Sequence, residues 1–218
     1  MTATLAAVHT DVTSVAWTWG TTAAERARSF PCDRWLPGAD DALFRAVDVD
    51  APAAVAFRWV CQLRVAPYSY DWIDNFGRQS PRTLTPGLDA LAVGQRVMSF
   101  FEIVGFERNS HVTAVTRSAL FGDIAATYVV LPRDEATCRL VVKVLVHHPL
   151  PPLGWITRAL LPWGDLVMMR KQLLTLKSLA EKRAGGCARE RASRPTGSGG
   201  IGGAQARGAE HRTGPQEI

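Results

Sequence analysis

Two strand-like runs and the segment after them decide the fold: GDIAATYVVL (122–131), CRLVVKVLVH (138–147) and LPWGDLVMMRKQLLTLKSLAEKR (161–183). Both runs are rich in β-branched and aliphatic residues, and the short connection between them favours an antiparallel pair. In the third segment apolar residues recur at spacings of three and four, which predicts a long helix with one apolar face. These residues are Leu166, Met169, Leu173, Leu176 and Ala180.

Further elements are expected upstream of this core. Gln95–Phe106 and His111–Thr116 complete a four-strand meander, and Leu43–Val49 is an earlier strand. A helix is predicted over Pro52–Leu63, and the proline-rich and glycine-rich stretch Arg64–Leu91 is predicted to be a long irregular loop with about one helical turn. Strand, helix, antiparallel meander and long terminal helix together indicate the α+β class.

Composition sets the domain limits. Of the 218 residues, 47% are hydrophobic, which is ordinary for a globular chain. Residues 184–218 hold nine of the 18 glycines and almost no large apolar side chain, so a disordered tail is predicted there. We expect a weakly ordered segment over 1–28 and one domain over 29–183. The net charge is +5, but no dense basic stripe occurs, so no nucleic-acid partner is expected.

The location is inferred from the cysteines and the N-terminus. None of the four cysteines forms a CxxC pair, and no Lys or Arg precedes Arg26, so a reduced, cytoplasmic protein is expected. Arg158, Pro162 and Asp165 interrupt the most apolar stretch, Leu153–Met169, which argues against stable membrane insertion. The sequence does not indicate the oligomeric state.

Several short motifs resemble the bacterial SRPBCC superfamily, which includes START lipid-transfer domains and polyketide cyclase/dehydrase proteins. The specific motif is Tyr-Ser-Tyr-Asp-Trp-Ile-Asp-Asn at 68–75, and Trp59-Val60-Cys61-Gln62 is a second. Weaker matches are Trp-Gly-Thr at 19–21 and Asp-Ala-Pro at 50–52. The resemblance spans roughly residues 17–183.

The resemblance implies a helix-grip fold, in which a curved antiparallel sheet wraps around the long C-terminal helix and encloses an apolar cavity. Our main hypothesis is therefore the binding, or transport, of a hydrophobic or amphipathic small molecule in that cavity. An alternative is a polyketide cyclase/dehydrase-type enzyme, and the sequence leaves open whether any reaction occurs.

Aromatic and polar residues on the first helix, the long loop and the strands are the candidates for lining the cavity. Aromatic rings combine a large contact area with a polar tip, which suits the mouth of an apolar pocket, although the same residues could pin the loop to the core. The ligand-binding candidates are Trp59, Gln62, Tyr68, Tyr70, Trp72, Asn75, Phe100, Glu102 and Tyr128.

Glu102, Asp71 and Tyr70 are the candidates for acid–base catalysis. Glu102 follows an apolar strand pattern, so its side chain either points into the cavity or lies at an exposed edge. In a buried position its pKa would rise, as a general acid requires. Asp71 could equally cap a turn. Gln62 could tie the loop by hydrogen bonds instead of contacting a ligand.

No cofactor or metal is expected. The chain contains no glycine-rich phosphate loop, and the neighbours His147 and His148 would point to opposite faces of a strand.

A further alternative is a module that docks on a membrane surface or a partner. Its basis is the apolar segment Leu153–Met169, where Trp155 and Trp163 lie between Arg158 and Arg170.

Overall fold

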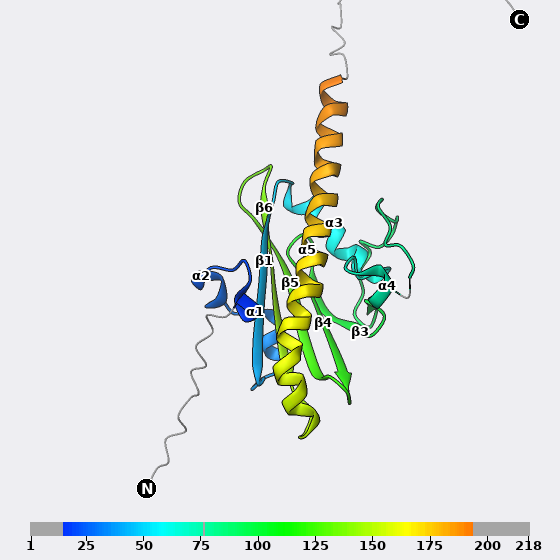
Figure 1. Ribbon diagram of the computed structural model, residues 1–218. Coiled ribbons are helices and arrows are strands. Elements are labelled where there is room, and N and C mark those ends of the chain that lie inside the picture. The colour runs from blue at the N-terminus through cyan, green and yellow to red at the C-terminus, as the bar shows by residue number, and fades with distance from the viewer. Residues whose placement is uncertain (1–14, 76, 194–218) are drawn as a thin grey trace, which may run out of the picture.

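The computed structural model describes residues 15–75 and 77–193 (Figure 1). One antiparallel sheet has the strand order β1-β6-β5-β4-β3-β2, so the meander continues from β2 to β6 and β1 joins its far side. Four of the five predicted strands are confirmed to within a few residues, and the fifth, Gln95–Phe106, is divided into two. The observed strands are β1 (Asp41–Val49), β2 (Arg96–Val97), β3 (Phe101–Glu107), β4 (His111–Ser118), β5 (Gly122–Pro132) and β6 (Cys138–His147).

A long helix, α5 (Leu153–Ser193), lies across one face of the sheet, and the shorter α3 (Ala53–Cys61) lies beside it (Figure 1). The main core lies between these helices and the sheet, where Leu173 and Leu176 of α5 meet strand residues such as Leu140. This arrangement confirms the predicted α+β, helix-grip class.

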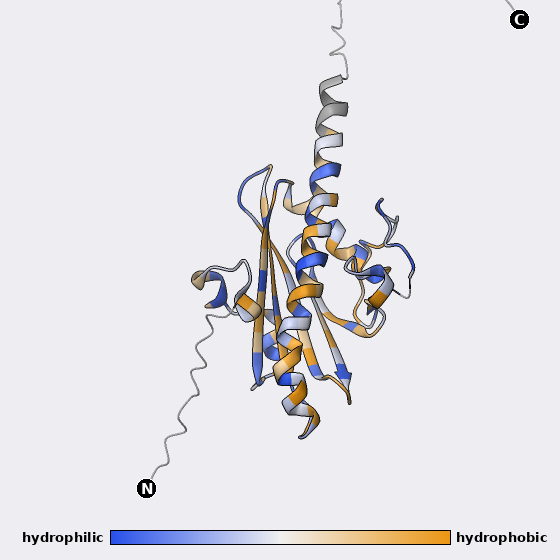
Figure 2. Ribbon diagram, viewed as in Figure 1, coloured by the Kyte–Doolittle hydropathy of each residue, from blue (hydrophilic) through white to orange (hydrophobic). Residues whose placement is uncertain are grey.

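The N-terminal half of α5 carries many hydrophobic residues, and orange is more frequent there than in the C-terminal part of the helix (Figure 2). The helix begins before the predicted start at Leu161 and contains Pro162 in its interior. It also continues through 184–193, which the composition assigned to the tail. Residues 184–187 are largely exposed, so this extension follows from helix propagation beyond the packed segment. Residues 194–218 lie outside the described residues.

The residues just before β1 also fold against the sheet, although weak order was expected up to residue 28. Helix α1 (Val15–Thr18) packs on β1 and α5, and α2 (Ala23–Arg26) is closed by a capping box of Thr22 and Glu25. The 3₁₀ turn η1 (Pro31–Arg34) contributes to a smaller core on the opposite face of the sheet. Residues 1–14 lie outside the described residues.

The chain between Val97 and Phe101 interrupts what the sequence pattern indicated as one strand. Met98 and Ser99 adopt left-handed backbone angles, with φ of 49° and 69°. Alternation of side chains therefore does not carry over from Met98 to the residues of β3. Two short elements, η2 (Gln62–Arg64) and α4 (Asp71–Asp74), lie in the long loop that precedes this point.

Candidate functional site

A cavity of about 300 Å³ lies between the sheet and α5. Ile124, Ala126 and Tyr128 of β5 face it, because alternate residues of a strand share a face. Val144 of β6 pairs with Ala126 in the register and extends the same wall. The facing wall comes from α5, whose lining residues are Leu161, Asp165, Met168, Met169 and Gln172. The remaining lining residues are Pro67, Ser69, Met98, Phe100, Phe101 and Phe121.

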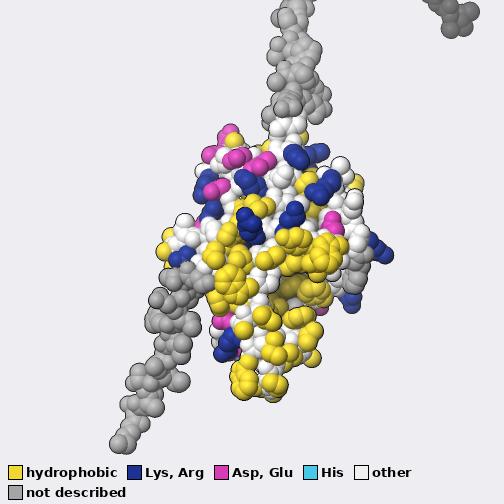
Figure 3. All heavy atoms as spheres, viewed as in Figure 1, with side chains coloured by type: hydrophobic (Ala, Val, Ile, Leu, Met, Phe, Trp, Pro, Cys, Tyr) yellow, Lys and Arg dark blue, Asp and Glu magenta, His cyan; other side chains and the backbone are white. Residues whose placement is uncertain are grey.

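Most of these side chains are aliphatic, aromatic or thioether groups. The space-filling view shows a hollow among hydrophobic side chains beside the N-terminal half of α5 (Figure 3). Thioethers are flexible and polarisable, so Met98, Met168 and Met169 can adapt their shape to a bound molecule. A lining of this chemistry suits an apolar molecule.

A hydrogen-bonded chain crosses one side of the cavity. The Tyr128 hydroxyl donates to Oε1 of Gln172 at 2.7 Å, and Nε2 of Gln172 donates to the carbonyl oxygen of Pro67 at 2.7 Å. Burial raises the pKa of the Tyr128 phenol, so the hydroxyl stays a neutral donor at physiological pH. These hydrogen bonds connect β5, α5 and the loop before α4, and the polar atoms of Tyr128 and Gln172 are satisfied by them.

A buried ion pair lies at the other side. Arg45 of β1 is fully buried, and its guanidinium contacts Oδ2 of Asp165 at 2.7 Å. The same guanidinium donates to the carbonyl oxygens of Phe44 and Ala16. Burial raises the pKa of Asp165, while Arg45 opposes that shift. Asp165 also lines a second, apolar groove of about 410 Å³ between α5 and the β4–β5 turn.

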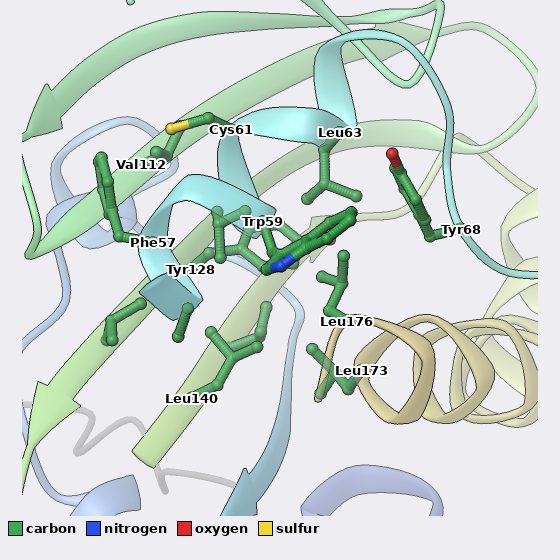
Figure 4. Close-up of a cluster of buried hydrophobic side chains, with 14 of the residues drawn as sticks. Phe57, Trp59, Cys61, Leu63, Tyr68, Val112, Tyr128, Leu140, Leu173 and Leu176 are labelled. Atoms are coloured by element: carbon green, nitrogen blue, oxygen red, sulfur yellow. The ribbon is translucent and has the colours of Figure 1, made fainter. Parts of the chain in front are cut away.

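Two of the nine residues predicted to contact a ligand, Phe100 and Tyr128, line this cavity. Trp59 and Tyr68 instead belong to the main core, where Figure 4 shows them near Leu63 and Leu176. Their rings meet edge to face, with centroids 6.2 Å apart. Neither Nε1 of Trp59 nor the Tyr68 hydroxyl has a hydrogen-bond partner among the described residues. Burial raises the pKa of Tyr68 to about 12.

The polar candidates Gln62, Asp71 and Asn75 make hydrogen bonds to other residues of the long loop and so stabilise its conformation. Oε1 of Gln62 accepts a hydrogen bond from the Thr85 amide at 2.8 Å, which is the tying role that the sequence left open. Asp71 accepts hydrogen bonds from the Ser80 amide and hydroxyl. The side-chain amide of Asn75 donates to the carbonyl oxygen of Arg78.

The two aromatic candidates of this loop also lie outside the set of lining residues. Tyr70 is half-buried and precedes the first residue of α4. Trp72 is 75% exposed. Ser69 and Pro67, which flank Tyr68, are the loop residues that reach the cavity.

Glu102 lies at an exposed position, the second of the two placements that its strand pattern allowed. It borders a more polar hollow on the other side of the sheet, together with Arg117 and Asp123. Phe101 and Ile103 of β3 pack towards the core, so strand alternation turns Glu102 to the opposite face. The burial on which its role as a general acid depended is therefore not present.

Sequence reasoning did not single out the polar lining residues of α5. Asp165 and Gln172 are seven residues apart and share the inward face with Met169 and Leu176. The sequence did contain a signal for them, since a carboxylate and an amide interrupt an otherwise apolar helix face. Buried polar groups need specific partners, so such an interruption points to a polar contact or a ligand site.

The side chain of His148 is buried, and both of its ring nitrogens contact protein groups. Its Nε2 lies 2.7 Å from Oδ2 of Asp41, and its Nδ1 lies 3.0 Å from Oγ1 of Thr157. This contact fastens the start of α5 to β1. Across residues 15–75 and 77–193, no three His, Cys, Asp or Glu side chains are grouped closely enough to hold a metal ion. Within the same part of the chain, no helix is both long and apolar enough to cross a membrane.

Comparison with known proteins gives matches among solved structures alone. No family model matches the chain, and no curated protein matches it. Similar structures include the di-domain aromatase/cyclase BexL of the BE-7585A biosynthetic pathway, with 16% identity and a TM-score of 0.40. That match covers 64% of this chain and 46% of BexL, so the chain spans less than half of that protein.

Two other solved structures match this chain over most of their own length. A START superfamily protein from Mycobacterium smegmatis has 15% identity and a TM-score of 0.39, over 67% of this chain and 98% of that protein. The Zhui aromatase/cyclase from Streptomyces sp. R1128 has 14% identity and a TM-score of 0.42, over 65% and 94%.

Proposed function

We propose that this protein binds a hydrophobic or amphipathic small molecule in the cavity between the sheet and α5. The observation that carries the proposal is the cavity of about 300 Å³, whose walls are apolar apart from a few polar side chains. Such a volume lies at the lower end of the range for small-molecule pockets.

The polar groups restrict the chemistry of the ligand. Tyr128 and Gln172 already satisfy each other, so the part of the ligand beside them is expected to be apolar. Asp165 keeps acceptor capacity at the end of the cavity nearest the second groove. A hydroxyl or similar donor on the ligand would lie at that end, which makes an amphipathic molecule a better fit than a pure hydrocarbon.

Native mass spectrometry of the purified full chain, followed by solvent extraction, is the first test. We expect an adduct that leaves on denaturation and extracts as an apolar compound. The fluorescence of the lipophilic dye Nile red can then be titrated to measure its affinity, both for the empty protein and for protein in which the dye displaces a bound molecule.

A matched pair of variants locates that signal. Ala126→Phe places a ring in the cavity wall, whereas Ala136→Phe adds the same ring at an exposed turn between β5 and β6. We expect Ala126→Phe to weaken dye binding at least about tenfold, because the ring occupies the ligand volume, and Ala136→Phe to leave it unchanged. Equal affinity of both variants, with unchanged circular dichroism, would contradict binding in this cavity.

Binding, rather than a cyclase-type reaction, is the function we propose. Tyr70, Asp71 and Glu102 are not among the lining residues, so an acid–base mechanism through those three has no geometric support. The ionisable lining residues are Tyr128, whose pKa is raised by burial, and Asp165, which is paired with Arg45.

A further inference from the structure

The protein carries a large apolar surface next to the cavity. Six exposed side chains make up what we call the apolar rim: Phe121, Trp155, Ile156, Leu160, Trp163 and Val167. Trp155 is 70% exposed and Leu160 is 65% exposed, values far from those of a packed helix face. Exposed apolar clusters of this kind mark interaction surfaces.

The rim is continuous with the mouth of the cavity. The groove between α5 and the β4–β5 turn is lined by Phe121, Ile156 and Leu160, which belong to the rim. Phe121, Leu161 and Asp165 line both this groove and the cavity. An apolar molecule moving from the rim through the groove would therefore reach the cavity along an apolar path.

Positively charged residues lie within and beside the apolar rim. Arg158 is exposed within it, although its guanidinium also contacts Asp40 at 3.1 Å. Arg170 and Lys171 are exposed one turn beyond Val167, and the guanidinium of Arg170 lies 5.8 Å from the centre of the Trp19 ring. Asp165, the acidic residue of this half of α5, faces inward to Arg45. The outward charges of this part of the helix are thus positive, which complements anionic headgroups.

We propose that the apolar rim docks the protein on an anionic lipid surface, so that the groove and the cavity mouth open against the membrane. The proposal rests on the proposed function, since it names the lipid surface as the place where the ligand enters or leaves. Trp155 and Trp163 suit the interface, where indole rings sit at headgroup level. Lys171 can extend its stem along the apolar stripe and keep its charge at the headgroups.

A second copy of the chain is the competing occupant. Ile156, Leu160, Trp163 and Val167 are spaced by four, three and four residues, as in a helix pair. A paired helix would cover this stripe alone, whereas the rim also includes Phe121 of the β4–β5 turn. The extension onto a second element around the cavity mouth favours a broad lipid surface.

Vesicle flotation tests the proposal with the full chain. Vesicles of phosphatidylcholine alone and vesicles with added phosphatidylglycerol serve as probes, and light scattering coupled to gel filtration reports the oligomeric state. We expect the protein to float with the anionic vesicles and to be monomeric. A dimer that does not float, or a monomer that does not float, would overturn the proposal.

Matched variants locate the contact. Trp155→Glu should weaken partitioning at least about tenfold, because it removes an indole that docking would bury in the lipid interface and adds a negative charge. The control Val93→Glu, at an exposed loop site, should not weaken it. Lys171→Glu should weaken binding to the anionic vesicles at least about fivefold, and Lys182→Glu, further along the helix, should have a smaller effect. Equal losses within either pair would contradict docking through the rim.

The two proposals fail separately. If Nile red binds in the cavity but the protein does not float, the ligand site stands and docking is refuted. If the protein floats but Ala126→Phe leaves dye binding unchanged, docking stands and the cavity is not the binding site.

Discussion

Two buried tyrosines offer a sharp test of how the cavity wall is held. Tyr128→Phe removes a hydroxyl that donates to Oε1 of Gln172 at 2.7 Å. Tyr68→Phe removes a hydroxyl that has no hydrogen-bond partner among the described residues. Both side chains are at most 3% exposed, so both variants delete one oxygen from the protein interior.

The expected magnitudes differ because the two hydroxyls differ in their partners. A net hydrogen bond contributes about 1 kcal/mol, and leaving a buried acceptor unsatisfied costs about 1–3 kcal/mol. Gln172 keeps its bond to Pro67 but loses the donor to Oε1, so Tyr128→Phe should lower the free energy of unfolding by about 2 kcal/mol. Tyr68→Phe removes an unpaired polar group and should leave stability unchanged within about 0.5 kcal/mol, or raise it.

Urea unfolding monitored by circular dichroism measures the difference, and an unchanged m-value confirms that the comparison is between like states. Equal losses in the two variants would refute the assignment of the Tyr128–Gln172 bond as a structural contact. A loss confined to Tyr68→Phe would show that its hydroxyl has a partner in solution.

Three further changes test other parts of the fold. Hydrogen bonds from Arg139 outweigh the opposing effect of burial and lower the pKa of Glu25 from 4.5 to about 2. Its stabilisation is therefore full above pH 4.5 and is lost as the pH falls towards 2. Because solvent partly screens the pair, Glu25→Gln should lower the free energy of unfolding by only about 1 kcal/mol at pH 7 and flatten that part of the stability profile. Asp165→Asn leaves the buried Arg45 guanidinium without its carboxylate and should cost about 3 kcal/mol in urea unfolding. Gly20→Ala should cost at least about 2 kcal/mol in thermal unfolding, because φ is +75° and the new Cβ would lie 2.1 Å from the Ala46 carbonyl oxygen.

Each of these variants has a control at a comparable site. Glu135→Gln alters an exposed carboxylate, and Asp89→Asn alters a half-exposed one whose nearest ion pair is 3.8 Å long. Gly38→Ala introduces a Cβ at a similar φ of +71° but into open space, so it should cost about 1 kcal/mol. If the controls lost as much free energy of unfolding as the three variants, the contacts assigned to Glu25, Asp165 and Gly20 would be contradicted.

The strands were predictable because their signal is local. In β5 and β6, β-branched residues fill both faces, and short turns leave antiparallel pairing as the simple connection. The start of α5 was not predictable in the same way. The apolar spacing placed its start at Leu161, but the contacts of the preceding turns, such as Thr157 with His148, keep the chain helical on both sides of Pro162.

The candidate site was only partly predictable, because a cavity is a property of packing between distant segments. Tyr128 and Phe100 were identified from aromatic character on the strands, and both line the cavity. Trp59 and Tyr68 have the same character, yet the backbone carries them into the core. Whether an aromatic ring fills a core or lines a cavity depends on what lies opposite, which residue type does not reveal.

Helix α5 illustrates how one segment can carry two apolar patterns. Its inward residues Met169, Leu173 and Leu176 are buried, as their spacing predicted. Its outward apolar residues Trp163 and Val167 lie in the first half of the helix and give way to cations one turn later. Core packing explains the first pattern completely and contributes nothing to the second, because an exposed indole gains no burial energy in the folded monomer. Most of these outward apolar residues lie beside the groove and the cavity mouth, and that proximity is the reason to expect a contacting surface outside the chain.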